Sequence, residues 1–238
     1  MSDGTKNQEL VRDGWTAVPR SQAKMLANVD KNRPAKIAVN QIKLPDTEVV
    51  KKTYEYAKRE LPMQTFNHSL RVYYYGAAIV KFHLPQFEPL LETYFLTCLL
   101  HDIGTTNTNL QATRMSFEFH GGFLALNLLQ QYGAAKSQAE SVCEAIIRHQ
   151  DLGDSGEISS VGQLIQLATV FDNMGINPHL IDSSTIESVV AAFPRHQWSS
   201  CFAATIREEV GLKPWCHTTS IEDFATGVEN NKLMYKYD

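Results

Sequence analysis

The sequence predicts an all-α fold, and three observations support this. From Asp46 onward, segments with the periodicity of amphipathic helices follow one another, separated by prolines and a glycine-rich loop. The alternating pattern of half-buried strands is scarce. No unit repeats at a fixed period, which argues against a solenoid. At 238 residues, with 43% hydrophobic and 20% charged residues, the chain has the size and composition of one compact domain.

The N-terminal part, residues 1–45, is expected to be an irregular extension. Pro19, Pro34 and Pro45 are scattered among basic residues, and no apolar periodicity is sustained between them. We therefore divide the chain into this extension and a helical domain that spans residues 46–238.

A helix beginning near Asn67 has a polar residue on its apolar face. His68 leads a stripe that continues through Val72, Tyr75 and Ile79 at helical spacing. This places an imidazole where apolar residues define the buried side of the helix.

The clearest helix is predicted from Phe87 to about Asp102. Its apolar residues fall at the i, i+3, i+4, i+7 spacing of one buried stripe, namely Phe87, Leu90, Leu91, Tyr94, Phe95, Cys98 and Leu99. The next position of that stripe is Asp102. Because burying an unpaired charge costs on the order of several kcal/mol, Asp102 requires hydrogen bonds, a cation or a metal.

Two later predicted helices also have a polar, ligand-type residue at or near an apolar face. In the helix before the glycine-rich loop at residues 153–156, the apolar positions Val142 and Ile146 are followed at helical spacing by His149. The segment Val161–Gly175 is apolar nearly all round, which predicts a central helix, and Asp172 lies near its end.

Five ligand-type residues on four predicted helices thus lie at or near apolar faces: His68, His101, Asp102, His149 and Asp172. One shared site would satisfy all of them. Two or three imidazoles with two carboxylates suit Zn²⁺, Fe²⁺ or Mn²⁺, whereas an all-oxygen cage suits Mg²⁺ or Ca²⁺ and thiolates suit a structural zinc. The sequence therefore predicts a catalytic transition metal.

Each of these residues also has a simpler explanation. A single histidine on an apolar face is more often a hydrogen-bonded core residue than a ligand, and Asp102 could pair with Arg71 or Arg148. The metal is favoured because, without it, each of the five buried polar residues would need its own separate hydrogen bonds or oppositely charged partner.

The order of these residues resembles the HD-domain metalloenzyme superfamily, with a His, an HD pair about thirty residues later, and a distant Asp. Longer strings resemble the cyanamide hydratase family, a branch of that superfamily, across roughly residues 67–220. They are NHSLRVYYYG, LTCLLHDIGTT, ATRMSFE followed by GG, EAIIRHQD, GQLIQLATVFDN and KPWCHTT. The resemblance implies an HD-domain helical bundle and leaves out the N-terminal extension.

The resemblance implies a zinc-dependent hydration of cyanamide to urea, with Fe²⁺ as the alternative metal. The family's metal ligands fall on His68, His101, Asp102 and Asp172. In the expected mechanism the metal lowers the pKa of bound water from about 15.7 to about 7, and hydroxide attacks the nitrile carbon. His149 falls on a catalytic position or one just outside the ligands. It is the expected proton donor to the nitrile nitrogen, with Asp102 as a second candidate.

Two threonines follow the HD pair, where many HD phosphohydrolases carry a lysine that meets phosphate. The hydroxyls of Thr105 and Thr106 suit a small neutral molecule, whereas a phosphate calls for Lys, Arg or another metal. We therefore expect Thr105 and Thr106 to bind the substrate. The competing explanation is a turn or a helix end, where hydroxyls commonly bond local backbone.

The composition argues against several other classes of protein. A net charge of −4 lacks the positive field typical of proteins that bind nucleic acid or anionic membrane. Four widely spaced cysteines without a CxxC pair favour reduced thiols. Neither a signal peptide nor a run of about 18 apolar residues occurs, so we place the protein in the cytosol or nucleus.

Three functions remain open from the sequence. The first is cyanamide hydration, with a small neutral nitrile as partner and neither nucleic acid nor membrane. The second is an HD-type phosphohydrolase acting on a nucleotide or small phosphoester. The third is a degenerate HD fold that binds or regulates, although intact ligand residues argue against loss of catalysis. The resemblance is compatible with a homo-oligomer, and the KPWCHTT segment with a lid, an interface or a simple loop.

Overall fold

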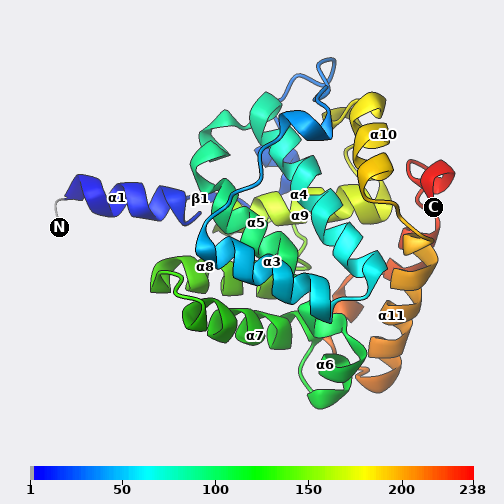
Figure 1. Cartoon of the computed structure of the whole chain (residues 1–238). Helices are drawn as coiled ribbons and strands as arrows, with labels where there is room; N and C mark the ends of the chain where they lie inside the picture. The colour runs from blue at the N-terminus through cyan, green and yellow to red at the C-terminus, as the bar shows by residue number, and fades with distance from the viewer. Residues whose placement is uncertain (1–2) are drawn as a thin grey trace.

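A computed structural model describes residues 3–238, which fold into a bundle of helices with one small two-stranded sheet (Figure 1). The all-α prediction is confirmed. The α-helices are α1 Asp3–Arg12, α2 Gln22–Met25, α3 Glu48–Glu60, α4 Met63–His83, α5 Leu91–Leu100, α6 Asn107–Ala112, α7 Phe117–Gln131, α8 Lys136–Arg148, α9 Ser160–Met174, α10 Ser183–Ala192, α11 Trp198–Leu212 and α12 Phe224–Glu229. The strands are β1 Ala17–Pro19 and β2 Glu157–Ser159, and the 3₁₀ helices are η1 Val39–Gln41, η2 Pro85–Leu90, η3 Ile103–Thr105, η4 Pro178–Leu180, η5 His217–Ser220 and η6 Tyr235–Tyr237.

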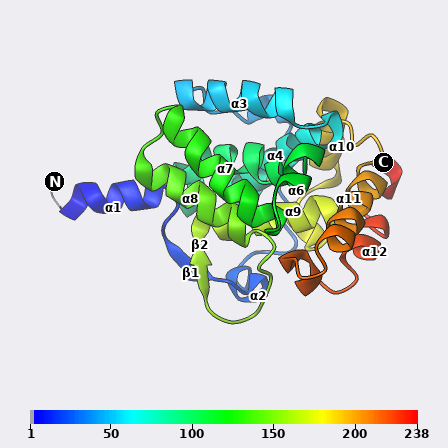
Figure 2. The ribbon, with the colours of Figure 1, turned by 90° about the horizontal axis from the view of Figure 1, so that it is seen from below.

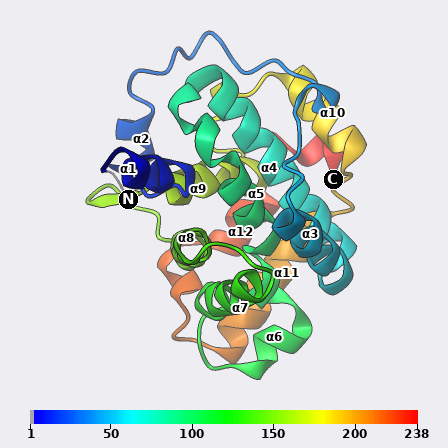
Figure 3. The same ribbon diagram turned by 60° about the vertical axis from the view of Figure 1, so that its left-hand side comes forward.

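Helices α4, α5 and α9 form the centre of the molecule. Each packs against the other two, and Figure 3 shows them surrounded by the remaining helices. Every residue of α9 from Ser160 to Asn173 is buried, which confirms the central helix predicted there. α9 ends at Gly175, which adopts the left-handed conformation with φ of 68°. Among the described residues, no helix is both long and apolar enough to cross a membrane.

The helix predicted from Phe87 to Asp102 is shorter than expected. The chain forms the 3₁₀ helix η2 as far as Leu90, and α5 then runs only to Leu100. Pro89 lies inside η2, and because proline has no amide hydrogen it cannot make the bond that would continue an α-helix. His101 and Asp102 therefore lie just beyond α5, where the chain turns into η3.

Residues 3–45, expected to be an irregular extension, also contain short regular elements. They contain α1, which projects from the body in Figure 1, and β1, which pairs with β2 along one edge in Figure 2. The pairing is antiparallel, with Ala17 opposite Ser159. α1 is polar and lacks an apolar stripe, and β1 depends on a partner distant in the sequence. Neither element could be found from local periodicity.

Gly76 allows α4 and α5 to approach closely. A Cβ atom at this position would overlap the side chain of Tyr94, whose buried hydroxyl donates a hydrogen bond to the carbonyl of Val72 at 2.7 Å. The only side chain that fits between these two helices is therefore a hydrogen atom.

Gly76→Ala is expected to lower the free energy of unfolding by about 1–3 kcal/mol, the usual range for overpacking a core. Urea denaturation measures the change. Gly211→Ala in α11 is the matched control, because no atom lies within 4 Å of where its Cβ would be. Alanine there should be neutral or stabilising by about 1 kcal/mol. Equal destabilisation by both substitutions would contradict the role of Gly76.

Candidate metal centre and pocket

Three buried side chains, from α4 and from the turn that follows α5, lie close together. The Nε2 atoms of His68 and His101 lie 3.2 Å apart. Oδ2 of Asp102 lies 3.3 Å from Nε2 of His101 and 3.7 Å from Nε2 of His68. In the described part of the chain, these residues are the one group of His, Cys, Asp or Glu with ligand atoms close enough to share a metal ion.

The hydrogen bonds of both imidazoles direct the Nε2 lone pairs at each other. Nδ1 of His101 donates to the carbonyl of Cys98 at 2.8 Å, and Nδ1 of His68 donates to Asp172 at 2.6 Å. A neutral imidazole carries a proton on only one ring nitrogen, so Nε2 of each ring is left as an acceptor. Two lone pairs and a carboxylate oxygen thus face one another, which is unfavourable unless positive charge lies among them.

The pKa shifts of these groups have the same origin. Burial lowers the pKa of His68 to about 4, although the hydrogen bond to Asp172 opposes the shift. Burial also acts to lower the pKa of His101, but the negative charge of Asp102 outweighs it and the pKa is raised. Burial acts to raise the pKa of Asp102, but His101 and His68 lower it to about 2. The cluster therefore favours an ionised carboxylate and attracts a positive charge.

In the part of the chain that the structure describes, Asp102 has no partner that satisfies its carboxylate. Both of its oxygens are buried and accept no hydrogen bond. The arginines considered as its partners bind elsewhere, because Arg71 pairs with Asp172 at 2.9 Å and Arg148 with Asp151 at 3.1 Å. A divalent cation would neutralise the orphaned carboxylate and accept both Nε2 lone pairs. These three side chains therefore fit a divalent metal.

Asp172 lies behind His68 and outside this cluster. Its carboxylate accepts hydrogen bonds from Nδ1 of His68, Nη2 of Arg71 at 2.9 Å and Nη1 of Arg195 at 2.7 Å. Burial acts to raise the pKa of Asp172, but the two guanidinium groups hold it well below its ordinary value. The geometry does not support the expectation that Asp172 is a metal ligand, because its oxygens are already engaged. A carboxylate that orients an imidazole in this way is common behind metal-binding histidines.

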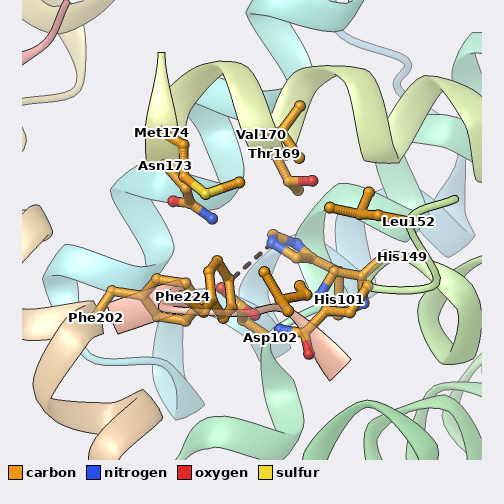
Figure 4. Close-up of a pocket in the computed structure, with 12 residues that line it drawn as sticks. His101, Asp102, His149, Leu152, Thr169, Val170, Asn173, Met174, Phe202 and Phe224 are labelled. Atoms are coloured by element: carbon orange, nitrogen blue, oxygen red, sulfur yellow. Dashed lines mark ion pairs between the residues drawn. The ribbon is translucent and has the colours of Figure 1, made fainter. Parts of the chain in front are cut away.

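A small cavity lies beside the cluster (Figure 4). Its lining consists of His101, Asp102, His149, Gln150, Leu152, Thr169, Val170, Asn173, Met174, Phe202, Ile221 and Phe224. In Figure 4, α9 supplies one wall, Phe202 and Phe224 close one end, and the dashed line marks the pair of His101 and Asp102. The centre of a water molecule can move over about 20 Å³ inside the cavity. Because one water needs about 10–15 Å³ on this measure, the cavity holds only a molecule of a few heavy atoms.

His149 lines the cavity next to His101. Its Nδ1 donates to the carbonyl of Ile146 at 2.6 Å, so in the neutral ring Nε2 is an acceptor. The rings of His149 and His101 are nearly perpendicular, with centroids 5.4 Å apart. Burial, together with the charge of His101, lowers the pKa of His149. The structure therefore favours a neutral His149 near pH 7, whereas the sequence analysis expected this residue to titrate near neutrality and donate a proton.

Thr105 and Thr106 make local bonds and do not line the cavity. The hydroxyl of Thr105 donates to the carbonyl of Asp102 at 2.7 Å, and that of Thr106 caps α6 by accepting from the amide of Asn109. The geometry does not support the expectation that they bind the substrate. The competing explanation, a turn and a helix end, describes both residues.

Several residues of the site were missed by the sequence analysis. Thr169 and Asn173 point into the cavity from α9 in Figure 4. They are polar residues at i and i+4 of a largely apolar, buried helix, and this spacing could have identified them as one polar face. Trp198 stacks on the ring of His68 with centroids 4.3 Å apart and donates to Oδ1 of Asn173 at 2.8 Å. No local pattern indicates this contact, because it joins distant segments.

The KPWCHTT segment is anchored as a loop close to the pocket. Trp215 donates to the carbonyl of Arg114 at 2.9 Å, His217 pairs with the buried Glu118 at 2.9 Å, and Thr218 donates to Glu209 at 2.6 Å. The chain then continues to Ile221 and Phe224, which line the cavity. The segment thus holds one wall of the pocket in place.

Comparison with known proteins identifies the family of the chain. The HD domain family matches residues 65–174, a range that includes the cluster, His149 and Asp172. The chain is also similar to two proteins of Saccharomyces cerevisiae (strain ATCC 204508 / S288c), cyanamide hydratase DDI2 and cyanamide hydratase DDI3. Each is 41% identical over 224 residues, which cover 93% of this chain and 98% of the relative.

The lowered pKa of His68 predicts a pH-dependent stability of the metal-free protein. The ordinary pKa of about 6.5 applies in the unfolded chain, so between that pH and about 4 the unfolded chain binds more protons than the folded one. The contribution is complete above about pH 6.5 and is lost as the pH falls towards 4. It amounts to about 3 kcal/mol.

Urea denaturation in the presence of a chelator measures this effect against His68→Gln, which removes the titrating group. The unfolding free energy of the unsubstituted protein minus that of the variant should shrink by about 3 kcal/mol between pH 7 and pH 4. A difference that stays constant over this range would show that His68 is not the titrating group.

Proposed function

The chain belongs to the cyanamide hydratase family of HD-domain proteins, and from this premise we propose that it catalyses the metal-dependent hydration of cyanamide to urea. The observation that carries the proposal is the buried group of His68, His101 and Asp102 at the edge of a cavity of about 20 Å³. Its orphaned carboxylate and converging lone pairs are suited to a metal, and the cavity is suited to a substrate of three heavy atoms.

We assign His68, His101 and Asp102 as the residues that would hold the metal. Zn²⁺ is proposed because two imidazoles and a carboxylate leave an open position for water, as in catalytic zinc sites, and Fe²⁺ remains the alternative. Either metal supplies a Lewis acid that lowers the pKa of water towards 7. Asp172 is proposed to orient His68 from behind and not to bind the metal itself.

His149 is proposed to move a proton during the reaction. Because its Nδ1 is held by the carbonyl of Ile146, its Nε2 is available to take a proton from the attacking water. The oxygen then bonds to the nitrile carbon, one carbon–nitrogen π bond breaks, and the nitrile nitrogen gains negative charge. His149 returns the proton to that nitrogen, which gives isourea. Transfer of the remaining hydroxyl proton to the same nitrogen then converts isourea to urea, so atoms and protons balance. The lowered pKa of His149 favours this base-then-acid role.

The lining of the cavity favours a neutral nitrile over a phosphoester. Within residues 3–238, no Lys or Arg side chain lines it, and its volume is far too small for a nucleotide. Thr169 and Asn173 are the proposed polar contacts of the substrate, since Oδ1 of Asn173 is occupied by Trp198 and the amide nitrogen points into the cavity in Figure 4. The cytosolic or nuclear location and a homo-oligomer remain predictions from the sequence.

Urea release from cyanamide tests the proposed reaction. The purified protein loaded with Zn²⁺ should produce urea, and a chelator should abolish this while added Zn²⁺ restores it. A panel of nucleotides and a generic phosphoester provides the comparison and should yield no phosphate. Phosphate release without urea would instead favour the phosphohydrolase.

His101→Ala and His149→Ala are expected to separate metal binding from turnover. His101→Ala should lose both bound metal and urea production, because it removes one of only three ligands. His149→Ala should keep the metal and lose about 10²–10⁴-fold in kcat, the usual contribution of a general acid or base. Elemental analysis and urea assays measure the two effects.

His83→Ala is the control, because His83 lies on α4 with His68 but bonds the distant carbonyl of Leu180. It should retain both metal and turnover. Equal metal loss in His101→Ala and His149→Ala would make His149 a ligand and contradict its assignment as a proton carrier.

A further inference from the structure

A second carboxylate, that of Asp238, is linked through Arg195 to Asp172, the residue that orients His68. Arg195 is completely buried and binds two acidic side chains at once. Its Nη1 donates to Oδ1 of Asp172 at 2.7 Å, and its Nε donates to Oδ1 of Asp238 at 2.8 Å. A continuous series of short contacts therefore runs from Asp238 through Arg195 and Asp172 to Nδ1 of His68.

The charges of this group balance only when Asp238 is counted. Arg71 and Arg195 contribute two positive charges, and Asp172 contributes one negative charge in the same buried region. The carboxylate of Asp238, with 20% of its side chain exposed, supplies the second negative charge. Without it, a completely buried guanidinium group would lose one of its two ion pairs, and such a loss is costly in the protein interior.

The C-terminal segment holds Asp172 at a second point. Nδ2 of the buried Asn231 donates to the backbone carbonyl of Asp172 at 3.0 Å, and Met234 lies in the hydrophobic core. The remaining guanidinium nitrogen of Arg195 donates to the hydroxyl of Ser199 at 3.0 Å. Residues 231–238 thus fix both the backbone of Asp172 and the arginine that binds its side chain.

We propose that Asp238 is a positioning residue of the metal centre, which acts through Arg195 and Asp172 to hold the imidazole of His68 towards the metal. The inference rests on the metal site proposed above. If Asp238 is neutralised, Arg195 has a single carboxylate partner and is drawn towards Oδ1 of Asp172. Because the carboxylate is rigid, a shift of Oδ1 also moves Oδ2, which accepts from Nδ1 of His68. The orientation of His68 then becomes less well defined, and metal affinity falls.

Asp238→Asn in the untagged full chain tests this proposal. Metal-free protein is titrated with Zn²⁺ in competition with a chromophoric chelator at pH 7, well below the melting temperature. The Kd is expected to rise about tenfold, at the lower end of the effect of outer partners on metal sites. Asp238→Glu restores the charge and should bring the Kd back to within about threefold of the original value. The Nδ1 proton of His68, observed by NMR in metal-free protein, should shift in Asp238→Asn.

Glu229→Gln is the matched control. It breaks the exposed pair of Arg207 and Glu229, which joins α11 and α12 at 2.6 Å without contacting the site. It should leave the Kd unchanged. A Kd of Asp238→Asn within about twofold of the original protein, even with a lower melting temperature, would overturn the proposal, and so would an equal loss in Glu229→Gln. If the unsubstituted protein binds no Zn²⁺, the proposed function fails instead, so the two failures are distinguishable.

Discussion

Two imidazole nitrogens and one carboxylate converge in the interior of this protein, and when both rings are neutral no hydrogen atom lies between them. The Nδ1 atoms of His68 and His101 are already used as donors. Their Nε2 atoms lie 3.2 Å apart, and each lies 3.3–3.7 Å from Oδ2 of Asp102. Such an arrangement is stable only if a cation is shared or if another group absorbs the repulsion. The packing of α4 against α5, with no side chain at Gly76, brings the three ligands to this point.

The two carboxylates near His68 have different surroundings. Near the cavity, Asp102 is the single carboxylate of the group and has no arginine partner. On the far side of His68, Asp172 is bound by two buried arginines, which keep it ionised and aligned with Nδ1. The stacked ring of Trp198 further limits the movement of His68. The carboxylate that orients the ligand is thus neutralised by the protein, whereas the carboxylate beside the cavity is left for a metal.

The pocket combines these charges with a small, largely apolar enclosure. Aromatic side chains from α11 and α12 close one end, and polar side chains of α9 face the cluster. A restricted volume with few polar groups favours a compact neutral substrate, and the low dielectric strengthens every remaining electrostatic interaction. The C-terminal third of the chain therefore contributes to the site in two ways, since it closes the cavity and also stabilises the ionic support of His68.

The sequence by itself determined the helical class, the central position of α9 and the burial of His68, His101, Asp102, His149 and Asp172, because apolar periodicity is a local property. It also showed that these buried polar residues need hydrogen bonds or an opposite charge. Only the tertiary structure decided which partner each of them has. Asp172 meets arginines distant in the sequence and Asp102 meets none, Thr105 and Thr106 bond local backbone, and β1 finds its partner in β2. These outcomes depend on contacts between remote segments, and helical spacing contains no information about them.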